Sequence, residues 1–430
     1  YIMRFYKNIE ACRICGSKNL IEVIHIEDQY LSPTFVQTNV NNPLADIRVP
    51  QTLVLCDKSD NNDGCGLLQL KETVDPDLLY REYFYRSAVS DTMRRDLHDV
   101  VDEVLNNTQV TVQDNDVVLD TGANDCTMLS YFPETLTRIG VEPANNIDWG
   151  HVPDSISIVN DYFTYDAIKE TLGDKKIKIL TSCAMFYDLD EPNNFVADVK
   201  KSLDPQGVWC IQLSYLPSML KNINFYDICN EHLEYYSLQT LHNLMERHGL
   251  SIFDATTNHV NGGSARVFIT HSERELEETE RLQALYKMEA SLDLNNEQTY
   301  FNFKAKIDEL KNKIKSTMLS EIQQGKLVLG LGASTKGNML LQLFDIGKET
   351  IPYISERNPE KVGLKTLGTD IELISEERAR ELNPSCMLVL PWYFKDEIVK
   401  REKEYLENGG KLLFPMPYPH IVHKDGETQL

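Results

Sequence analysis

The sequence contains no apolar run that approaches the roughly 20 residues needed to cross a membrane as a helix. Its first residues, Tyr1-Ile2-Met3-Arg4, are not followed by the apolar stretch of a secretory signal. We therefore expect a cytoplasmic protein with no membrane partner. A chain of 430 residues is too long for one ordinary hydrophobic core, so we expect two or three domains and, by default, a monomer.

Positive charge is scarce as well. The chain has 43 lysines and arginines against 66 aspartates and glutamates, which gives a formal net charge of −23. Binding to nucleic acid requires a basic surface, so this balance argues against a nucleic-acid partner. A nucleotide ligand requires only a local set of donors and is not excluded, and the excess of acid otherwise favours solubility.

The cysteines do not suit a disulfide framework, because there are nine of them in a chain of cytosolic character. Four form two pairs: Cys12 and Cys15 have C-x-x-C spacing, and Cys56 and Cys65 follow about 40 residues later. Four thiolates supplied by two turns are typical of a closed, structural zinc site, which we predict. The second pair is wider than C-x-x-C, so a redox pair or unpaired thiols is the alternative.

Strand-like and helical stretches alternate along most of the chain, in one series that begins near residue 116 and a second near residue 326. Alternation of this kind predicts an α/β fold with parallel sheets that carry helices on both faces. Two such series in one chain suggest two ligands, or one ligand bound between them.

The first series opens with a turn that has few glycines, Leu119-Asp-Thr-Gly-Ala-Asn-Asp. One glycine is too few for a dinucleotide-binding turn, and the pattern suits S-adenosylmethionine (SAM) better. Gly122 would let the backbone approach the ligand, and Asn124 belongs to the same pattern. Asp120 and Asp125 would favour the amino and sulfonium charges. The alternative is a plain strand-to-helix turn.

Acidic residues also end the next two strands. Glu142 lies about 20 residues after Asp120, where a carboxylate can accept hydrogen bonds from both ribose hydroxyls of a nucleoside. We expect Asp161, at the end of the following strand, to reach the adenine amino group, with a surface turn as the alternative.

The second series opens with Gly-Ala-Ser-Thr-Lys-Gly-Asn, which contains Ser334, Lys336 and Asn338. A helix N-terminus with small residues and one lysine is an anion site. SAM has no phosphate, so this turn suits the diphosphate of a nucleotide-sugar, with a plain turn as the alternative. Glu356 would accept from the nucleotide ribose, and Trp392 would pack near the base or the sugar.

Four blocks of sequence, in this order, resemble the sugar C-methyltransferases of deoxysugar pathways, which make branched 3-C-methyl sugars on nucleotide carriers. The resemblance covers nearly the whole chain. The first block is the cysteine pairs with Gly66-Leu67-Leu68-Gln69-Leu70, and the second is Tyr83-Phe84-Tyr85-Arg86-Ser87. The third joins the Gly122 turn with Asn230-Glu231-His232 and Gly263-Ser264-Ala265-Arg266, and the fourth begins with the Gly332 turn.

The resemblance implies a zinc-binding domain (1–75), a SAM-binding class I methyltransferase domain (76–272), a helical connector (273–325) and a Rossmann-like nucleotide-sugar-binding domain (326–430). It places the nucleotide-sugar between the last two domains. It also implies site residues: Tyr83 would lie near the SAM methyl group. The residues that would contact the substrate are Tyr85, Ser87, Asn230 and Arg266.

Methylation of carbon requires a base that removes a proton beside a ketone, so that an enolate can attack the methyl group. We predict that His232 is this base and that Glu231 holds its tautomer or binds the substrate. The family has Tyr-His-Glu-His here, whereas this chain has Cys229-Asn230-Glu231-His232 and lacks the phenol. O- or N-methylation of a nucleotide-sugar, or a catalytically silent nucleotide-sugar-binding protein, are the alternatives.

Overall fold

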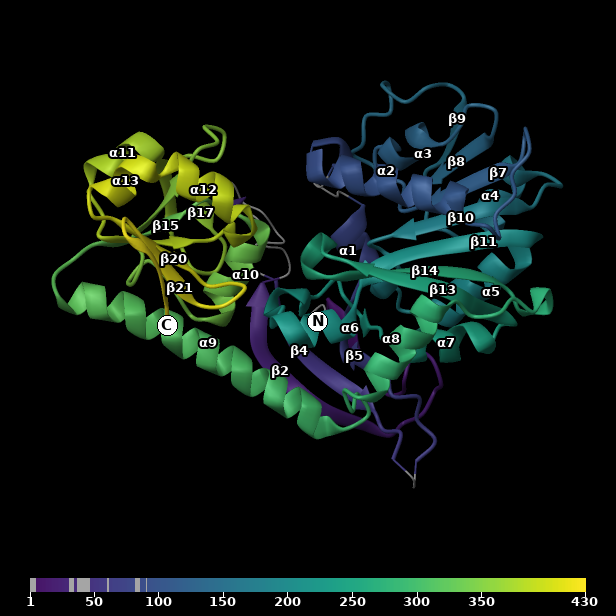
Figure 1. Cartoon of the computed structure of the whole chain (residues 1–430), viewed down its shortest axis with the longest axis horizontal. Helices are drawn as coiled ribbons and strands as arrows, with labels where there is room; N and C mark the ends of the chain where they lie inside the picture. Colours follow the sequence, from purple (N-terminus) through teal and green to yellow (C-terminus); the bar gives the residue numbers. More distant parts are fainter. Residues whose placement is uncertain (1–4, 31–34, 37–46, 60–61, 82–85, 90) are drawn as a thin grey trace. The chain divides into compact units, whose positions relative to one another are not determined.

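The computed structural model divides into two compact units, each described here by itself (Figure 1). The first unit comprises Tyr1–Val23 and Thr52–Thr299, and the second comprises Ile24–Gln51 and Tyr300–Leu430. The residues that the structure describes are 5–30, 35–36, 47–59, 62–81, 86–89 and 91–430. Tyr83 and Tyr85 lie outside them.

The N-terminal part of the chain forms two small sheets. β1 (Tyr6–Asn8) pairs with β6 (Glu72–Val74) in an antiparallel ribbon. The other sheet has four strands in the order β12-β5-β4-β2, in which β12 comes from far along the chain. Its strands are β2 (Leu20–Tyr30), β4 (Arg48–Cys56), β5 (Leu68–Leu70) and β12 (Glu234–Tyr235).

A seven-stranded sheet in the order β13-β14-β11-β10-β7-β8-β9 is the centre of the first unit. Its strands are parallel except that β14 runs antiparallel to both β11 and β13. The strands are β7 (Val117–Thr121), β8 (Thr137–Val141), β9 (Ile156–Val159), β10 (Ile177–Cys183), β11 (Leu203–Ser214), β13 (Leu250–Asn258) and β14 (Ser264–His271).

Helices cover both faces of this sheet (Figure 1). Because side chains alternate along a strand, Val117 and Leu119 of β7 join one core and Val118 joins the other. Residues of α4, α5, α7 and α8 pack in the first core, and residues of α2 and α3 in the second. The helices are α1 (Pro76–Tyr80), α2 (Asp91–Asn106), α3 (Thr127–Tyr131), α4 (Tyr165–Leu172), α5 (Pro192–Ser202), α6 (Leu216–Asn222), α7 (Leu238–Glu246) and α8 (Glu280–Ala290).

Short 3-10 turns connect several of these elements. They are η1 (Ser87–Val89), η2 (Phe186–Asp188), η3 (Phe225–Asp227), η4 (Val260–Gly262) and η5 (Ser272–Arg274). Local sequence explains the helix starts: Ser237 forms a capping box with Thr240 at α7, and Thr164 accepts from the Ala167 amide at α4.

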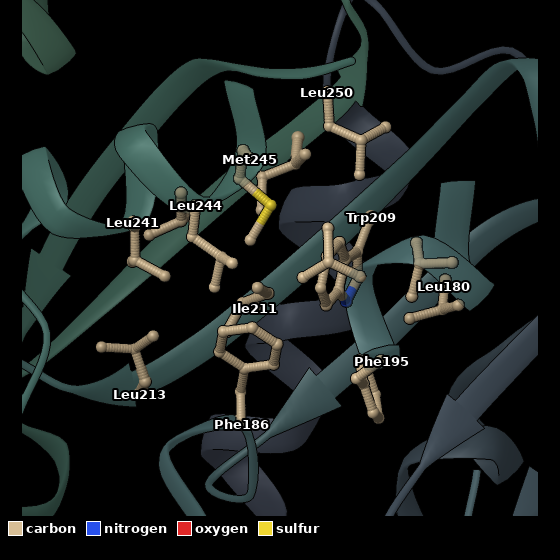
Figure 2. Packing of buried hydrophobic residues seen from close by; sticks show 14 of the residues in the cluster. Leu180, Phe186, Phe195, Trp209, Ile211, Leu213, Leu241, Leu244, Met245 and Leu250 are labelled. Atoms are coloured by element: carbon tan, nitrogen blue, oxygen red, sulfur yellow. The ribbon is translucent and has the colours of Figure 1, made fainter. Parts of the chain in front are cut away.

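Aromatic side chains fill the larger core of the first unit (Figure 2). The rings of Phe186 and Trp209 meet edge to face at 5.3 Å, and Phe195 stacks on Trp209 at 5.9 Å. Trp209 is fully buried, and its Nε1 donates to the Ser182 hydroxyl at 3.0 Å. Helix α7 adds Leu241, with Leu244 and Met245 one turn on, as its spacing predicts (Figure 2).

The second unit is built on a nine-stranded sheet in the order β22-β21-β20-β19-β15-β16-β18-β17-β3. The strands β20, β19, β15, β16 and β18 are parallel, and the others add antiparallel edges. The strands are β3 (Phe35–Val36), β15 (Val328–Leu331), β16 (Tyr353–Glu356), β17 (Lys365–Thr366), β18 (Glu372–Ser375), β19 (Cys386–Val389), β20 (Lys411–Phe414), β21 (His420–His423) and β22 (Gly426–Gln429).

The helices of this part are α9 (Glu297–Gln323), α10 (Thr335–Leu343), α11 (Glu376–Glu381), α12 (Lys395–Arg401) and α13 (Lys403–Glu407), with η6 (Trp392–Phe394). The predicted α/β class with two parallel-sheet parts is confirmed. The predicted domain boundaries stay predictions, and the grouping of Ile24–Gln51 with the second unit was not anticipated. Among the described residues, none of the helices has the length and apolar character required to cross a membrane.

Replacing Trp209 with alanine should lower the free energy of unfolding of the first unit by about 3–5 kcal/mol, because the substitution removes a fully buried aromatic side chain and leaves a cavity. Phe5→Ala is the control, since Phe5 is 40% exposed and should cost little. Urea unfolding followed by circular dichroism measures both. Equal losses in the two variants would contradict this packing.

Candidate active site and metal centre

The four predicted cysteine ligands come together in the first unit. The sulfurs of Cys12, Cys15, Cys56 and Cys65 all lie within 4.8 Å of one another. Cys12 and Cys65 are 3.5 Å apart, as are Cys15 and Cys56. Zinc–sulfur bonds of about 2.3 Å place the sulfurs of a regular tetrahedron about 3.8 Å apart, so these residues fit a zinc ion with no open position.

The turns around the cysteines explain why this sequence builds the site. The Cys65 amide points at the Cys56 sulfur at 3.3 Å. Gly64 is required, because a Cβ atom there would lie 2.0 Å from the Asp57 carbonyl oxygen. Hydrogen bonds from Cys12 and then Cys65 lower the pKa of the Cys56 thiol, while hydrogen bonds to Cys12 and Cys56 raise the pKa of the Cys65 thiol.

The first glycine turn lies at the carboxyl end of β7. Gly122 has φ +68°, and a Cβ atom there would approach the Cγ of Met185 to 3.2 Å. Glu142 follows β8, and its two oxygens accept from the amides of Asn124 at 2.8 Å and Ala144 at 2.9 Å. Each oxygen keeps a further lone pair, so this carboxylate can still accept from a ribose.

Asp120 lies beneath this turn and is 3% exposed. It accepts from the Thr181 hydroxyl at 2.7 Å. Burial raises its pKa to about 8, and the neighbouring Glu142 carboxylate adds to the shift. A bound cation would relieve both effects, which suits the ammonium or sulfonium of SAM.

Asn124 and Asp125 are engaged inside the protein. Asn124 accepts from the Ser87 amide at 3.1 Å. One oxygen of Asp125 accepts from the Ala88 amide at 2.8 Å, and the other accepts from the Thr127 hydroxyl at 2.6 Å. Through these hydrogen bonds both side chains anchor the segment at Ser87 to the turn.

Asp161 does not lie in an enclosed site. Its side chain is 56% exposed, and one oxygen lies 3.6 Å from the guanidinium of Arg81. Its contact with adenine stays a prediction, with a surface turn as the alternative.

The His232 side chain is half-buried, and two contacts hold its ring in place. Its Nδ1 lies 2.8 Å from the Asp227 carbonyl oxygen, and its ring meets the Tyr187 ring edge to face at 4.6 Å. A carbonyl oxygen can only accept, so Nδ1 of the neutral ring carries the proton and Nε2 is the basic nitrogen.

Carboxyl groups gather around this ring. Burial raises the pKa of Glu231 and raises that of Asp188 well above its usual range, while the charge of His232 opposes both shifts. Asn230 is 2% exposed, and neither polar atom of its side chain has a hydrogen-bond partner among the described residues. A small cavity is bordered by His232, Tyr187 and their neighbours.

The predicted substrate contact of Arg266 is corrected by its surroundings. All five N–H groups of its guanidinium donate hydrogen bonds. Nε and one terminal nitrogen donate to the Gln212 side chain, and the remaining three hydrogen bonds go to carboxylates. Those carboxylates are on α2: Asp96, Asp99 and Glu103. The guanidinium therefore ties β14 to α2 and has no donor left for a substrate.

The second glycine turn lies in the second unit. Ser334 caps α10, and its hydroxyl accepts from the Gly337 amide at 3.0 Å. Glu356, at the end of β16, accepts from the amides of Ala333 at 2.9 Å and Asn358 at 2.7 Å. The turn thus repeats the arrangement of Gly122 and Glu142 in the first unit.

The other predicted residues of this turn differ in exposure. The ammonium of Lys336 lies 5.3 Å from the centre of the Tyr393 ring. Asn338 is 1% exposed and Trp392 is 6% exposed, so Trp392 packs inside the unit. Tyr393 and Phe394, which are about half exposed, are the aromatic residues on the surface here.

Sequence reasoning missed residues at the carboxyl end of β10. Thr181, Met185 and Tyr187 contact Asp120, the Gly122 turn and His232 respectively. These residues could have been predicted, because ligands of parallel sheets bind at the carboxyl ends of neighbouring strands and β10 is next to β7.

Comparisons with known proteins bear on the whole chain. Family models match residues 12–80 as a zinc binding domain, 89–254 as "Methyltransferase domain" and 259–417 as "C-methyltransferase C-terminal domain". The C-methyltransferase NovU of Streptomyces niveus is 27% identical over 416 residues, which cover 96% of this chain and 97% of NovU. Together these matches support membership of a C-methyltransferase family.

One similar solved structure is a SAM-dependent methyltransferase from Clostridium acetobutylicum, which is 11% identical to this chain. The match has a TM-score of 0.34 and covers 43% of this chain and 93% of that chain. A second is the YcgJ protein from Bacillus, with 12% identity and a TM-score of 0.32 over 40% of this chain and 97% of that chain.

The family membership confirms the predicted enzyme class and cofactors. The protein is a methyltransferase that uses SAM and carries a structural zinc site. The resemblance to the sugar C-methyltransferases is confirmed at the level of the family. The roles of individual site residues stay predictions.

Cys56→Ser should lower the zinc content from about one ion per chain to near zero and lower the melting temperature, because three thiolates leave the tetrahedral set incomplete. Atomic absorption and thermal unfolding measure both. Cys386→Ser is the matched control, since Cys386 is equally buried but lies outside the cluster. Full zinc content in Cys56→Ser would contradict the four-cysteine site.

Asp120 should make the protein less stable as pH rises. Its folded-state pKa of about 8 lies above the usual value of about 3.9, so between these values the folded state holds a proton that the unfolded state has released. The contribution is complete below about pH 4 and is lost as pH rises to about 8, on the order of 1 kcal/mol per pH unit.

Asp120→Asn does not titrate, so its free energy of unfolding should decline less over this window in urea unfolding at several pH values. The exposed Asp154→Asn is the control and should follow the wild type. An unchanged decline in Asp120→Asn would show that another group is responsible.

Proposed function

We propose that the protein transfers the SAM methyl group to a carbon atom of a nucleotide-linked keto-deoxysugar. The observation that carries this proposal is the orientation of His232, whose Nδ1 is held by the Asp227 carbonyl so that Nε2 is the basic nitrogen. A carbon acceptor requires such a base to remove a C–H proton, a step that oxygen and nitrogen acceptors do not include.

In the proposed reaction, Nε2 of His232 removes the proton from the carbon beside the ketone, and Glu231 steadies the resulting imidazolium. SAM, when bound, would supply an electrophilic methyl group, with its S–CH3 bond breaking and S-adenosylhomocysteine as the leaving group. The C–H electron pair becomes part of an enolate, whose carbon forms the new bond, and the proton stays on His232 until solvent takes it. Asn230, with two unpartnered polar atoms, is proposed to bind the sugar.

For SAM we propose that Glu142 accepts from the ribose, that Asp120 offsets the positive charge, and that Gly122 gives the backbone close approach. Asn124 and Asp125 would act by holding the segment at Ser87 in place. Tyr83 and Tyr85 remain proposed contacts of SAM and substrate.

For the nucleotide-sugar we propose that the α10 N-terminus and Lys336 receive the diphosphate. Ser334 would fix the turn and Glu356 would accept from the nucleotide ribose through its remaining lone pairs. Asn338 and Trp392 would support the site from within, since both are buried.

O- or N-methylation is the second candidate, favoured by Cys229, which is 8% exposed and stands where the motif of the sugar C-methyltransferases that the chain resembles has a phenol. A buried thiol cannot take over the reach of that phenol. The two candidates differ in one step, because only carbon methylation requires loss of a C–H proton.

Deuterium exchange at the carbon beside the ketone tests this step without SAM turnover. With dTDP- or UDP-linked 4-keto-deoxyhexoses as probes, the wild type should exchange the label and His232→Asn should lose at least about 100-fold in rate, because the base is removed. Mass spectrometry measures the label.

His242→Asn is the matched control, since His242 lies on α7 and pairs with Glu246. Titration calorimetry with SAM should give the same affinity for all three proteins. Full exchange in His232→Asn would remove the base assignment, and absence of SAM binding in the wild type would contradict the site at Gly122.

A further inference from the structure

A buried arginine lies inside the zinc turn. Arg13 stands between Cys12 and Cys15, and its side chain is 2% exposed. One terminal nitrogen donates to the Leu70 carbonyl at 2.6 Å and the other donates to the Thr73 hydroxyl at 2.6 Å. These partners lie on β5 and β6, directly after Cys65.

The same guanidinium reaches the chain beside His232. Its Nη1 lies 3.5 Å from the Leu233 carbonyl oxygen, and its Nε lies 3.8 Å from a carboxylate oxygen of Glu234. Glu234 is 2% exposed, so this carboxylate lies in the interior with the arginine. A second carboxylate, Asp190, accepts from Nε at 3.3 Å.

The backbone beside His232 is therefore held from two directions. On one side the Leu70 amide donates to the Leu233 carbonyl at 2.8 Å, and β12 pairs with β5. On the other side the Leu233 amide donates to the Tyr187 carbonyl at 2.8 Å. Arg13 adds to the first set of contacts, from a position that the two neighbouring cysteines fix.

Arg13 itself has little freedom. Zinc ligation fixes the backbone on both sides of it, and its amide donates to the Gln69 side chain at 3.1 Å. A guanidinium is a rigid planar fork, so a fixed Arg13 backbone also fixes where its partners lie. A lysine would place one compact charge there and could not reach the Leu70 carbonyl, the Thr73 hydroxyl and the Asp190 carboxylate together.

We propose that Arg13 is a positioning residue, which links the zinc turn to the backbone beside His232 and so fixes where the His232 side chain lies. The zinc site then has a role beyond stability, because it sets the orientation of the proposed base. This inference rests on the proposed function of His232. The expected cost of losing the alignment is large, since a shift of about 1 Å at a reacting group costs about 100-fold in rate.

Hydrogen exchange followed by mass spectrometry tests the proposal without a substrate. In Arg13→Gln, peptides that cover residues 229–236 should exchange faster, while peptides that cover 117–127 exchange as in the wild type. Zinc content should stay near one ion per chain and SAM affinity within about twofold, since the cysteines and the Gly122 turn are intact. Arg13→Lys should be intermediate.

Arg138→Gln is the matched control. Arg138 is also buried and donates to the Leu129 and Phe132 carbonyls, but it lies on β8, away from β5 and β12. It should lower stability and leave exchange at 229–236 unchanged. Unchanged exchange at 229–236 in Arg13→Gln, or an equal rise in Arg138→Gln, would overturn the proposal.

A kinetic readout separates positioning from simple destabilisation. In the deuterium-exchange assay, Arg13→Gln should lose about 100-fold in kcat with little change in KM, and Arg13→Lys should recover part of that loss. Equal kcat values for Arg13→Gln and the wild type would also overturn the proposal. If the wild type exchanges no deuterium, the proposed function has failed, and the exchange at 229–236 still decides whether Arg13 holds this segment.

Discussion

Parallel pairing of β10, β7 and β8 is the constraint on which the first unit depends. The ladder sets Thr181 beside Asp120 and Asp120 beside Gly140, although about 60 residues separate the first pair. Carboxyl ends of parallel strands meet at one edge, so the polar side chains that follow them have to converge there. The cofactor turn, the Glu142 carboxylate and the loop after β10 are consequences of that register.

Burial at this edge sets the chemistry of its acidic groups. Asp120 and Glu142 both have raised pKa values because water is excluded from them. The same holds for Asp188 and Glu231 near His232. These buried carboxyl groups therefore favour a ligand that is cationic or that donates hydrogen bonds.

Motifs carried by neighbouring residues could be predicted from the sequence. The C-x-x-C pair, the Gly122 turn with Glu142, and Ser334 as a helix cap each depend on residues close in the chain or on strand periodicity. Arg266 could not be interpreted in this way, because its carboxylate partners lie more than 160 residues away on α2. The hydrogen bond of Asp125 could not be predicted for a related reason, since the amide that it binds belongs to a segment upstream of the turn.

The pairing of β3 with β17 has a consequence for biosynthesis. Phe35–Val36 lie opposite Lys365–Thr366 at the edge of the second sheet. During translation the first strand leaves the ribosome more than 300 residues before its partner exists. Phe35–Val36 therefore stay without this partner through synthesis of the whole methyltransferase fold, and a cell that makes this protein has to keep them from other strand edges until the chain is finished.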